Sequence, residues 1–376
     1  MMSYSSTTKL EKRAAELTSR SEAVAVGRAA WGLFTLLRIW KEENKIQKIA
    51  LPSLLCQSPL AATLLAGWQP EFCDVDPETG NVSNAEWNRV IDLGVHAVLF
   101  VHLFGNVGNA GHIADICLSK GIFFIEDAAQ SFGGSWGTQP CGSFGDASLI
   151  SFGHTKPIDV GHGGMVLTND SKLATAIRIF INTYSMPVSD TSYFANKFRE
   201  MFYLARRHLV TNPEAGRQRF KGLLLNYEPL IPSRWNPELA EKIFQMMNRL
   251  ESEVCRRREK DELYKGILCD TNLVPISMSN GSVPWRAVFR LPDIDWVKQN
   301  IISEAVRKEG VDISNWYIPA HWMTLTEIVP TLSLGSTELL SKEIFQLWID
   351  DKTDIGCIRR NCRIFKKVLN EVVYEK

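Results

Sequence analysis

The sequence predicts an α/β fold in which a large, mainly parallel sheet is followed by a smaller C-terminal domain. Between about residues 22 and 170, short apolar runs alternate with amphipathic helical stretches. This is the pattern of parallel strands whose crossover helices cover both faces of the sheet. The chain has 376 residues, more than one hydrophobic core usually organises. Beyond about residue 238 strands and helices mix less regularly, which favours a separate α+β domain.

The first unit of the sheet shows the expected order of strand, glycine turn and helix. An apolar run at residues 24–26 ends at Gly27. Apolar side chains then recur at the spacing of one helix face, at Ala30, Leu33, Phe34 and Leu37. Further apolar runs predict the other strands of a seven-stranded sheet: residues 48–51, 71–74, 97–101, 122–125, 147–151 and 165–167.

The second half of the chain is predicted to supply an insertion, a linking helix and the small domain. Residues 186–234 form a polar, arginine-containing stretch, which we interpret as an insertion that covers the substrate. Apolar residues at alternating spacings of three and four then predict one long helix that ends in the arginines at 256–258. We expect a large domain at residues 1–237 and, after it, the linking helix with a small domain at residues 238–376. The small domain is expected to contain a strand and a C-terminal helix, at residues 287–291 and 355–372.

The composition excludes several classes of function. Charged residues make up 22% of the chain, with 42 basic against 42 acidic side chains, so no field that attracts nucleic acid is expected. The eight cysteines form no Cys-x-x-Cys pair, which argues against a zinc ribbon and favours reduced cytosolic thiols. Residues 1–20 lack an apolar signal core, and no stretch approaches the ~18 apolar residues of a membrane span. We therefore expect a soluble, cytoplasmic protein.

Two polar segments follow apolar runs and are expected at the carboxyl ends of strands, where ligands of open α/β sheets bind. One contains Asp127 and the other contains Lys156. A lysine beside a carboxylate suits pyridoxal phosphate (PLP), because the lysine forms a Schiff base and the carboxylate holds the pyridine nitrogen protonated. Lys156 is then positioned to move a proton between substrate and cofactor. The alternative interpretations are a solvated surface lysine and a helix N-cap at Asp127.

Four nearby residues are candidates for the rest of a cofactor site. The backbone N–H groups of Arg28 and Ala29, where a strand turns into a helix, can receive a phosphate. Ser151 would add its hydroxyl to the same phosphate, or merely ends a strand. Gln130 is expected beside the phenolic oxygen of the cofactor, or is an ordinary exposed glutamine.

The histidines and arginines near these segments are weaker indications of a functional site than Asp127 and Lys156. His154 and His162 flank Lys156 without a third ligand at suitable spacing, so no metal site is predicted. The clusters at 206–208, 217–219 and 256–258 are interpreted as solvated helix faces. Contact with a substrate diphosphate is the alternative, because the planar fork of arginine suits it.

These segments resemble the DegT/DnrJ kind of nucleotide-sugar aminotransferase, a PLP fold type I (aspartate aminotransferase-like) family. The resemblance extends from about Val24 over most of the chain. It is carried by FCDVDPETG at 72–80, VHLFGN at 101–106, EDAAQSFGG at 126–134, GSFGDASLISFGHTK at 142–156 and GGMVLTND at 163–170. It implies a large sheet domain and a small C-terminal domain in a homodimer, with active sites at the subunit interface.

The resemblance also implies a reaction and a role for each candidate residue. The reaction moves an amino group from glutamate, by way of pyridoxamine phosphate, onto a nucleotide-linked keto-sugar. The related sugar 3-dehydratases carry histidine at the lysine position, so the lysine favours transamination. The implied roles are Lys156 as the Schiff-base lysine, Asp127 as the pyridine partner, Gln130 as a ring neighbour, and Ser151 with the Arg28 and Ala29 amides as the phosphate cup.

The sequence departs from the family pattern at several positions. Cys56 follows the Pro-Ser turn where the family has an aromatic residue that stacks on the cofactor ring. The family's Asn-x-Arg, which reaches the phosphate of the partner subunit, appears as Pro232-Ser233-Arg234. The Gly-Glu-Gly-Gly turn is residues 161–164, with His162 in place of the glutamate, and the Gly-Thr of the phosphate turn is Gly27-Arg28. These changes around an intact lysine and aspartate suggest an unusual acceptor.

Three hypotheses follow. The leading one is a PLP-dependent aminotransferase that acts on a keto-sugar or keto-polyol in glycan or secondary-metabolite assembly. The second is a noncatalytic relative that binds PLP or sugar in regulation or assembly. The third is PLP chemistry with another outcome, such as sugar dehydration.

Overall fold

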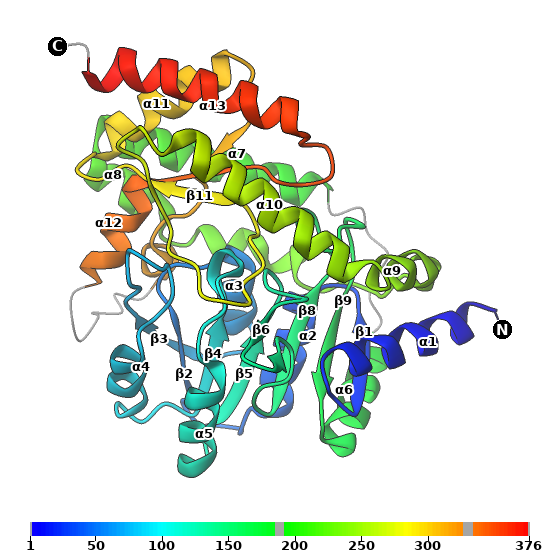
Figure 1. Ribbon diagram of the computed structural model, residues 1–376. Coiled ribbons are helices and arrows are strands. Elements are labelled where there is room, and N and C mark those ends of the chain that lie inside the picture. The colour runs from blue at the N-terminus through cyan, green and yellow to red at the C-terminus, as the bar shows by residue number, and fades with distance from the viewer. Residues whose placement is uncertain (1, 185–191, 326–333, 375–376) are drawn as a thin grey trace.

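The computed structural model describes residues 2–184, 192–325 and 334–374. Figure 1 shows a large twisted sheet flanked by helices and, above it, the C-terminal helices α11 (Trp296–Lys308) and α13 (Ile355–Leu369). The helix α10 (Leu250–Leu268) runs diagonally between these two parts and packs against α13. The α/β fold with a smaller C-terminal part is confirmed.

The large sheet has seven strands in the order β1-β9-β8-β5-β4-β2-β3. The strand β9 is antiparallel to its neighbours β1 and β8, and the remaining pairs are parallel. Each predicted run overlaps one of these strands. They are β1 (Glu22–Val26), β2 (Lys48–Pro52), β3 (Gln69–Cys73), β4 (Ala97–Val101), β5 (Phe123–Asp127), β8 (Ala147–Ser151) and β9 (Gly164–Thr168).

Both faces of this sheet are buried, which explains why its strands read as unbroken apolar runs. In β4, Leu99 packs into one core while its neighbours Val98 and Phe100 pack into the other. The helices divide in the same way between the two faces. The first core includes α2 (Ala29–Ile39), α3 (Gln57–Leu65) and α6 (Ser171–Thr183), and the second includes α4 (Asn84–Ile91) and α5 (Ala110–Lys120).

A third core joins the N-terminal helix to the linker. The helix α1 (Met2–Leu17), which the sequence analysis did not predict, packs against α9 (Ala240–Met247). The predicted single long helix is wrong, because a short 3-10 turn (Pro237–Leu239) and α9 precede a break at 248–249. The helix α10 then continues to Leu268, so the arginines at 256–258 lie inside it.

The small domain is a four-stranded antiparallel sheet in the order β10-β11-β13-β12. Its strands are β10 (Val274–Pro275), β11 (Ala287–Arg290), β12 (Ile313–Ser314) and β13 (Ile344–Leu347), and α12 (Gly335–Glu343) leads directly into β13. The strand β11 confirms the prediction at 287–291. Leu250 and Val254 of α10 belong to the core with the large sheet, whereas Tyr264 and Leu268 belong to the small-domain core. The helix therefore links the two cores, and the boundary at 237/238 stays a prediction.

Most of the described part of the polar stretch at 186–234 is helical. It contains α7 (Ser192–Thr211), α8 (Pro213–Phe220) and a 3-10 segment at Leu223–Leu230, while residues 185–191 lie outside the described residues. The interpretation of its arginines as solvated is wrong for Arg206. That side chain is 6% exposed and donates to Gln299 Oε1 at 2.6 Å. Burial lowers its pKa to about 9.

Candidate active site

The sheet brings Asp127 and Lys156 together at one edge. Asp127 is the last residue of β5, and Lys156 lies in the loop that follows the adjacent parallel strand β8. Each charge shifts the pKa of the other: the Lys156 ammonium opposes the rise in the pKa of Asp127, and the Asp127 carboxylate opposes the fall in the pKa of Lys156. A half-buried amine and a buried carboxylate are thus brought within electrostatic reach of each other.

Asp127 is 9% exposed, and burial raises the pKa of its carboxyl group. Its Oδ1 accepts a hydrogen bond from the Ala129 N–H at 2.9 Å, which together with Lys156 favours the charged form. No helix begins after Asp127, since residues 129–133 form turns. The alternative of a helix N-cap is therefore wrong, and the carboxylate instead caps a turn.

Lys156 is not a solvated surface lysine. Burial is the main cause that lowers the pKa of its ammonium, and the nearby Arg286 adds to the effect. Its Nζ lies 5.6 Å from the centroid of the Trp285 ring. The loop is fastened on both sides of the lysine, because Arg257 Nη2 donates to the Lys156 carbonyl at 3.3 Å and Trp285 Nε1 donates to Thr155 Oγ1 at 3.2 Å.

The residues expected to receive a phosphate are adjacent in the sheet. Ser151 pairs with Gly164 across β8 and β9, and an added Cβ on Gly164 would lie 2.7 Å from the Ala29 nitrogen. Arg28 forms a bridge with Gly163 and precedes α2, whose first two N–H groups, those of Ala29 and Ala30, lack intrahelical partners. The N-terminus of α2, Ser151 and the glycine turn therefore converge as the sequence predicted.

Two of the departures from the family pattern also meet here. His162 Nε2 and Ser233 Oγ are hydrogen-bonded at 3.0 Å within the same chain. An added Cβ on Gly27 would lie 2.2 Å from the Ser233 carbonyl oxygen. The segment that replaces the Asn-x-Arg motif thus packs on the phosphate turn of its own chain. Burial and the charge of Arg28 lower the pKa of His162.

Gln130 is 5% exposed, so it is not an ordinary surface glutamine. Its Oε1 accepts from the Phe104 N–H at 2.7 Å, and its Nε2 donates to the Tyr317 hydroxyl at 2.9 Å. One Nε2 hydrogen remains for a ligand. The contact with the phenolic oxygen of a cofactor stays a prediction.

A polar cluster behind Asp127 holds the preceding residue. Glu126 accepts from the Gly142 and Phe144 N–H groups at 2.8 and 3.0 Å. His102 Nε2 lies 3.0 Å from Glu126 Oε1, while its Nδ1 accepts from the Gly108 N–H at 3.1 Å. Burial opposes protonation of the ring, but the neighbouring Cys141 and Glu126 outweigh burial and raise the pKa of His102 to about 10. The Gly108 N–H calls for a lone pair on Nδ1, so the ring proton lies on Nε2, toward Glu126. Cys141 completes a group with metal-ligand atoms, but these contacts use both ring nitrogens, and the cluster contains neither His154 nor His162.

Several residues of the site were missed by the sequence analysis. Trp285, Arg286 and Tyr317 come from the small domain, and Arg257 comes from α10. Arg257 is buried, with its Nε 2.7 Å from Glu253 Oε1, so the interpretation of residues 256–258 as a solvated face is wrong for it. Cys56, at the start of α3, affects the pKa of Lys156 and therefore belongs to the site.

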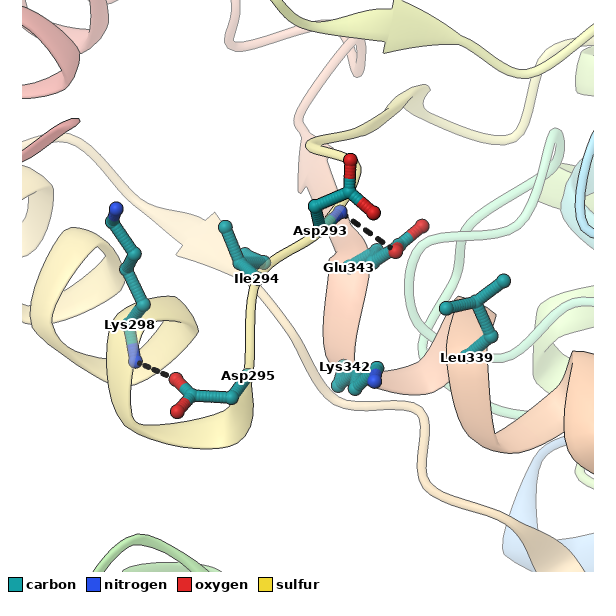
Figure 2. A pocket seen from close by; sticks show the side chains of 7 residues that line it. All are labelled: Asp293, Ile294, Asp295, Lys298, Leu339, Lys342 and Glu343. Carbon is teal, nitrogen blue, oxygen red and sulfur yellow. Dashed lines mark hydrogen bonds between the residues drawn. The ribbon is translucent and has the colours of Figure 1, made fainter. Parts of the chain in front are cut away.

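A separate hollow of about 370 Å³ lies in the small domain (Figure 2). Its lining side chains are mostly charged and come from α11, α12 and the turn before α11. Glu343 accepts from the Asp293 N–H at 3.1 Å and Asp295 from the Lys298 N–H at 2.8 Å, which are the two dashed contacts in Figure 2. These carboxylates already hold local backbone, and none of the candidate residues lines the hollow.

Residues 1–204 match the DegT/DnrJ/EryC1/StrS aminotransferase family, which is more than half of the 376-residue chain. The chain belongs to this family. The predicted family resemblance is confirmed.

Relatives in the family include sugar aminotransferases. The chain is 38% identical over 130 residues to a dTDP-4-dehydro-2,3,6-trideoxy-D-glucose 4-aminotransferase of Saccharopolyspora spinosa, which is 35% of this chain and 34% of the relative. It is 32% identical over 166 residues to GDP-perosamine synthase of Escherichia coli O157:H7, which covers 44% of this chain and 45% of that relative. A pleiotropic regulatory protein of Geobacillus stearothermophilus is 37% identical over 115 residues, covering 30% and 31%. These matches span a third to a half of the length of the curated relatives.

Solved structures of aminotransferases share the fold over nearly the whole chain. Helicobacter pylori PseC, an aminotransferase in pseudoaminic acid biosynthesis, has a TM-score of 0.79 at 17% identity and covers 97% of this chain and 91% of its own. DesI in the presence of its TDP-sugar product has a TM-score of 0.74 at 22% identity and covers 98% and 86%. The fold shared with these structures therefore includes the small domain.

The described residues fit PLP. Asp127 keeps its Oδ2 free of hydrogen bonds within the described chain. The Lys156 side chain is half-buried and forms no salt bridge with the described residues. A helix N-terminus lies beside Ser151. Across residues 2–184, 192–325 and 334–374, no helix is both long and apolar enough to cross a membrane.

Proposed function

We propose that the protein is a PLP-dependent aminotransferase that transfers an amino group from an amino acid, with L-glutamate as the donor, to a nucleotide-linked keto-sugar. One observation carries this proposal: a half-buried lysine and a buried carboxylate lie within electrostatic reach of each other at the edge of the large sheet in a member of an aminotransferase family. The names of the relatives that act on dTDP- and GDP-linked sugars support the acceptor class. A role in polysaccharide or antibiotic assembly, a cytoplasmic location and a homodimer complete the proposal.

Each residue of the candidate site has its own role in the proposed reaction. PLP, when bound, supplies an electron-withdrawing ring. Lys156, whose pKa burial lowers, offers a neutral amine for attachment and afterwards a base that moves a proton at the reacting carbon. Asp127 presents its carboxyl group to the ring nitrogen; burial raises the pKa of this group, and Lys156 and the Ala129 N–H oppose that rise. The Arg28 and Ala29 amides and the Ser151 hydroxyl hold the phosphate, and Gln130 lies beside the ring.

The altered stacking position has a substitute in the proposal. Cys56 cannot stack as an aromatic ring does, but the Trp285 indole lies 5.6 Å from Lys156 Nζ. Its position is fixed by the hydrogen bond to Thr155 and by a backbone N–H that donates to the Phe104 carbonyl at 2.9 Å. We propose that this indole supplies the aromatic wall of the site.

The test is the visible absorption spectrum of the purified protein with PLP, before and after addition of L-glutamate. We expect a band that Lys156→Ala abolishes and that glutamate converts to the spectrum of pyridoxamine phosphate. Lys172→Ala, which removes an exposed lysine at the start of α6, should leave both changes intact. A chain with no Lys156-dependent band would refute the proposal.

A noncatalytic role is the second candidate, and two observations favour it. One relative is a pleiotropic regulatory protein, and Cys56 replaces the stacking aromatic residue. A protein that binds PLP through Lys156 but shows no spectral change with glutamate, and transfers no amino group to any keto-sugar tested, would support this candidate. Release of ammonia with a deoxy-sugar would instead indicate dehydration.

A further inference from the structure

Arg286 is held between two indole rings in the small domain. It directly precedes β11, and the register of β11 with β13 pairs Ala287 with Leu347. One step further along this register, Arg286 faces Trp348. The guanidinium carbon lies 4.3 Å from the centroid of the Trp285 ring and 3.7 Å from that of the Trp348 ring. Such stacking fixes the plane of the guanidinium and leaves its edge for hydrogen bonds.

This guanidinium has no carboxylate partner among the described residues. Arg286 is 7% exposed, and its one hydrogen bond there is a long one, from Nη1 to Gln346 Oε1 at 3.5 Å. Its Nε is buried without an acceptor. Burial lowers its pKa to about 10. Asp312 and Asp350 act on its charge only from a distance. A buried cation without a counter-charge in contact is costly, so its retention calls for an anionic ligand.

Two further buried donors beside Arg286 also lack acceptors. Gln346 Nε2 and Trp348 Nε1 make no hydrogen bond in the described structure. Gln346 and Trp348 are two residues apart around the end of β13, so both side chains lie on the same face as Arg286. Three donors of this kind on one face form a set to which an acceptor can bind.

The donor set lies close to the amine of the proposed active site. Lys156 Nζ is 5.6 Å from the centroid of the Trp285 ring, and the Arg286 guanidinium carbon is 4.3 Å from the same centroid. The two cations are therefore no further apart than the sum of these distances. The effect of the Arg286 charge on the pKa of Lys156 agrees with this proximity.

We propose that Arg286, Gln346 and Trp348 form a carboxylate-binding subsite for a substrate of the Lys156 site. A single guanidinium with two neutral donors balances one negative charge, whereas a diphosphate would bring more charge than this face can neutralise. The carboxylate belongs either to the amino-acid donor or to a sugar acid that serves as acceptor. This inference rests on the proposed function, because the carboxylate belongs to a substrate that reacts at Lys156.

The test is calorimetric titration of the full-length, PLP-treated protein with compounds that carry no amine. 2-Oxoglutarate represents the donor, D-glucuronate represents a sugar acid, and inorganic phosphate tests the competing anion. We expect one of the carboxylates to bind more tightly than phosphate, and Arg286→Met to weaken that binding about tenfold or more. Arg290→Met removes the next arginine of β11, which is paired with Glu343 at 3.5 Å, and should leave the affinity unchanged.

Trp348→Phe keeps a ring against the guanidinium and removes one donor, so we expect it to weaken binding several-fold with the fold intact. The carboxylate whose binding these substitutions weaken identifies whether the subsite serves the amino-acid donor or a sugar acid. Tighter binding of phosphate, no carboxylate binding by the wild type, or equal binding by wild type, Arg286→Met and Trp348→Phe would overturn the proposal. If Arg286→Met does not fold, the Trp348→Phe result decides. Carboxylate binding needs no attachment to Lys156. A failure of the proposed function, seen in the absorption experiment, is therefore distinguishable from a failure of the carboxylate subsite, seen in the titration.

Discussion

The Arg257 guanidinium donates to the carbonyl oxygen of Lys156 at 3.3 Å and to that of Trp285 at 3.1 Å. It is itself held by Glu253, at 2.7 Å. One side chain of α10 therefore fastens the loop of the candidate catalytic lysine to the segment that carries Trp285. Arg257 acts through other residues, and we regard it as a positioning residue.

Arg257→Met should destabilise the protein by about 3–5 kcal/mol, because it leaves two carbonyls without their donor and removes one of the two arginines that hold the buried Glu253. Urea unfolding of wild type and variant measures the change. Arg256→Met is the matched control, since Arg256 is the exposed neighbour on the same helix and pairs with Glu253 and Asp351. Its loss should cost about 1 kcal/mol or less, and equal losses in the two variants would contradict the positioning role.

The sequence predicted the large sheet and the proximity of Asp127 and Lys156 because both depend on local pattern. Asp127 and Lys156 each follow an apolar run, so the strand ends place them without knowledge of other contacts. Arg286 and Trp285 enter from another domain, and no periodicity indicates which loop reaches the sheet edge. Arg257 carried a signal that was overlooked: it continues the spacing of the buried residues Leu250, Val254, Asp261, Tyr264 and Leu268.

The pH dependence of PLP capture should follow the Lys156 amine, which must be neutral to react. Burial lowers its pKa below the ordinary value of 10.5, so the rate at which the visible band forms should rise with pH to a midpoint below that value. Asp127 raises this pKa and Arg286 lowers it. Asp127→Asn should therefore move the midpoint to lower pH and Arg286→Met to higher pH. Shifts in the same direction, measured by stopped-flow absorbance, would contradict the electrostatic assignment.

Gly27→Ala should disrupt the phosphate turn. An added Cβ would lie 2.2 Å from the Ser233 carbonyl oxygen and 2.7 Å from the Arg234 carbonyl carbon, and backbone atoms cannot yield as a flexible side chain does. We expect a loss of about 1–3 kcal/mol in unfolding free energy and weaker PLP binding by fluorescence titration. Gly266→Ala is the control, since nothing lies within 4 Å of its added Cβ in α10. That variant should gain about 0.5–1 kcal/mol and bind PLP normally.

The contribution of Asp261 to the stability of the protein should fall as the pH rises through the pKa that its carboxyl group has in the folded state. Its carboxyl group is buried beside Lys265 Nζ at 2.7 Å, and burial raises its pKa from 3.8 to about 6. Between these values the folded state binds more protons than the unfolded state, so the contribution of this group to the unfolding free energy falls as pH increases. The unfolding free energy of the Asp261→Asn variant should therefore increase relative to that of wild type between pH 4 and pH 7, by up to about 3 kcal/mol.

The control for this prediction has a pKa shift of the opposite sign. Lys366, with Nζ 2.6 Å from Asp270 Oδ1, lowers the pKa of the exposed Asp270. That carboxylate stabilises the fold above its unfolded pKa, and the contribution is lost as pH falls through the folded value. The titration window of Asp270 therefore lies at and below its unfolded pKa of 3.8, so the difference in unfolding free energy between Asp270→Asn and wild type should change little from pH 5 to pH 7. Chemical unfolding at pH 4, 5, 6 and 7 compares the three proteins. If the difference between Asp261→Asn and wild type stays constant over this range, Asp261 is not titrating in the folded core, and its ion pair with Lys265 keeps it charged throughout.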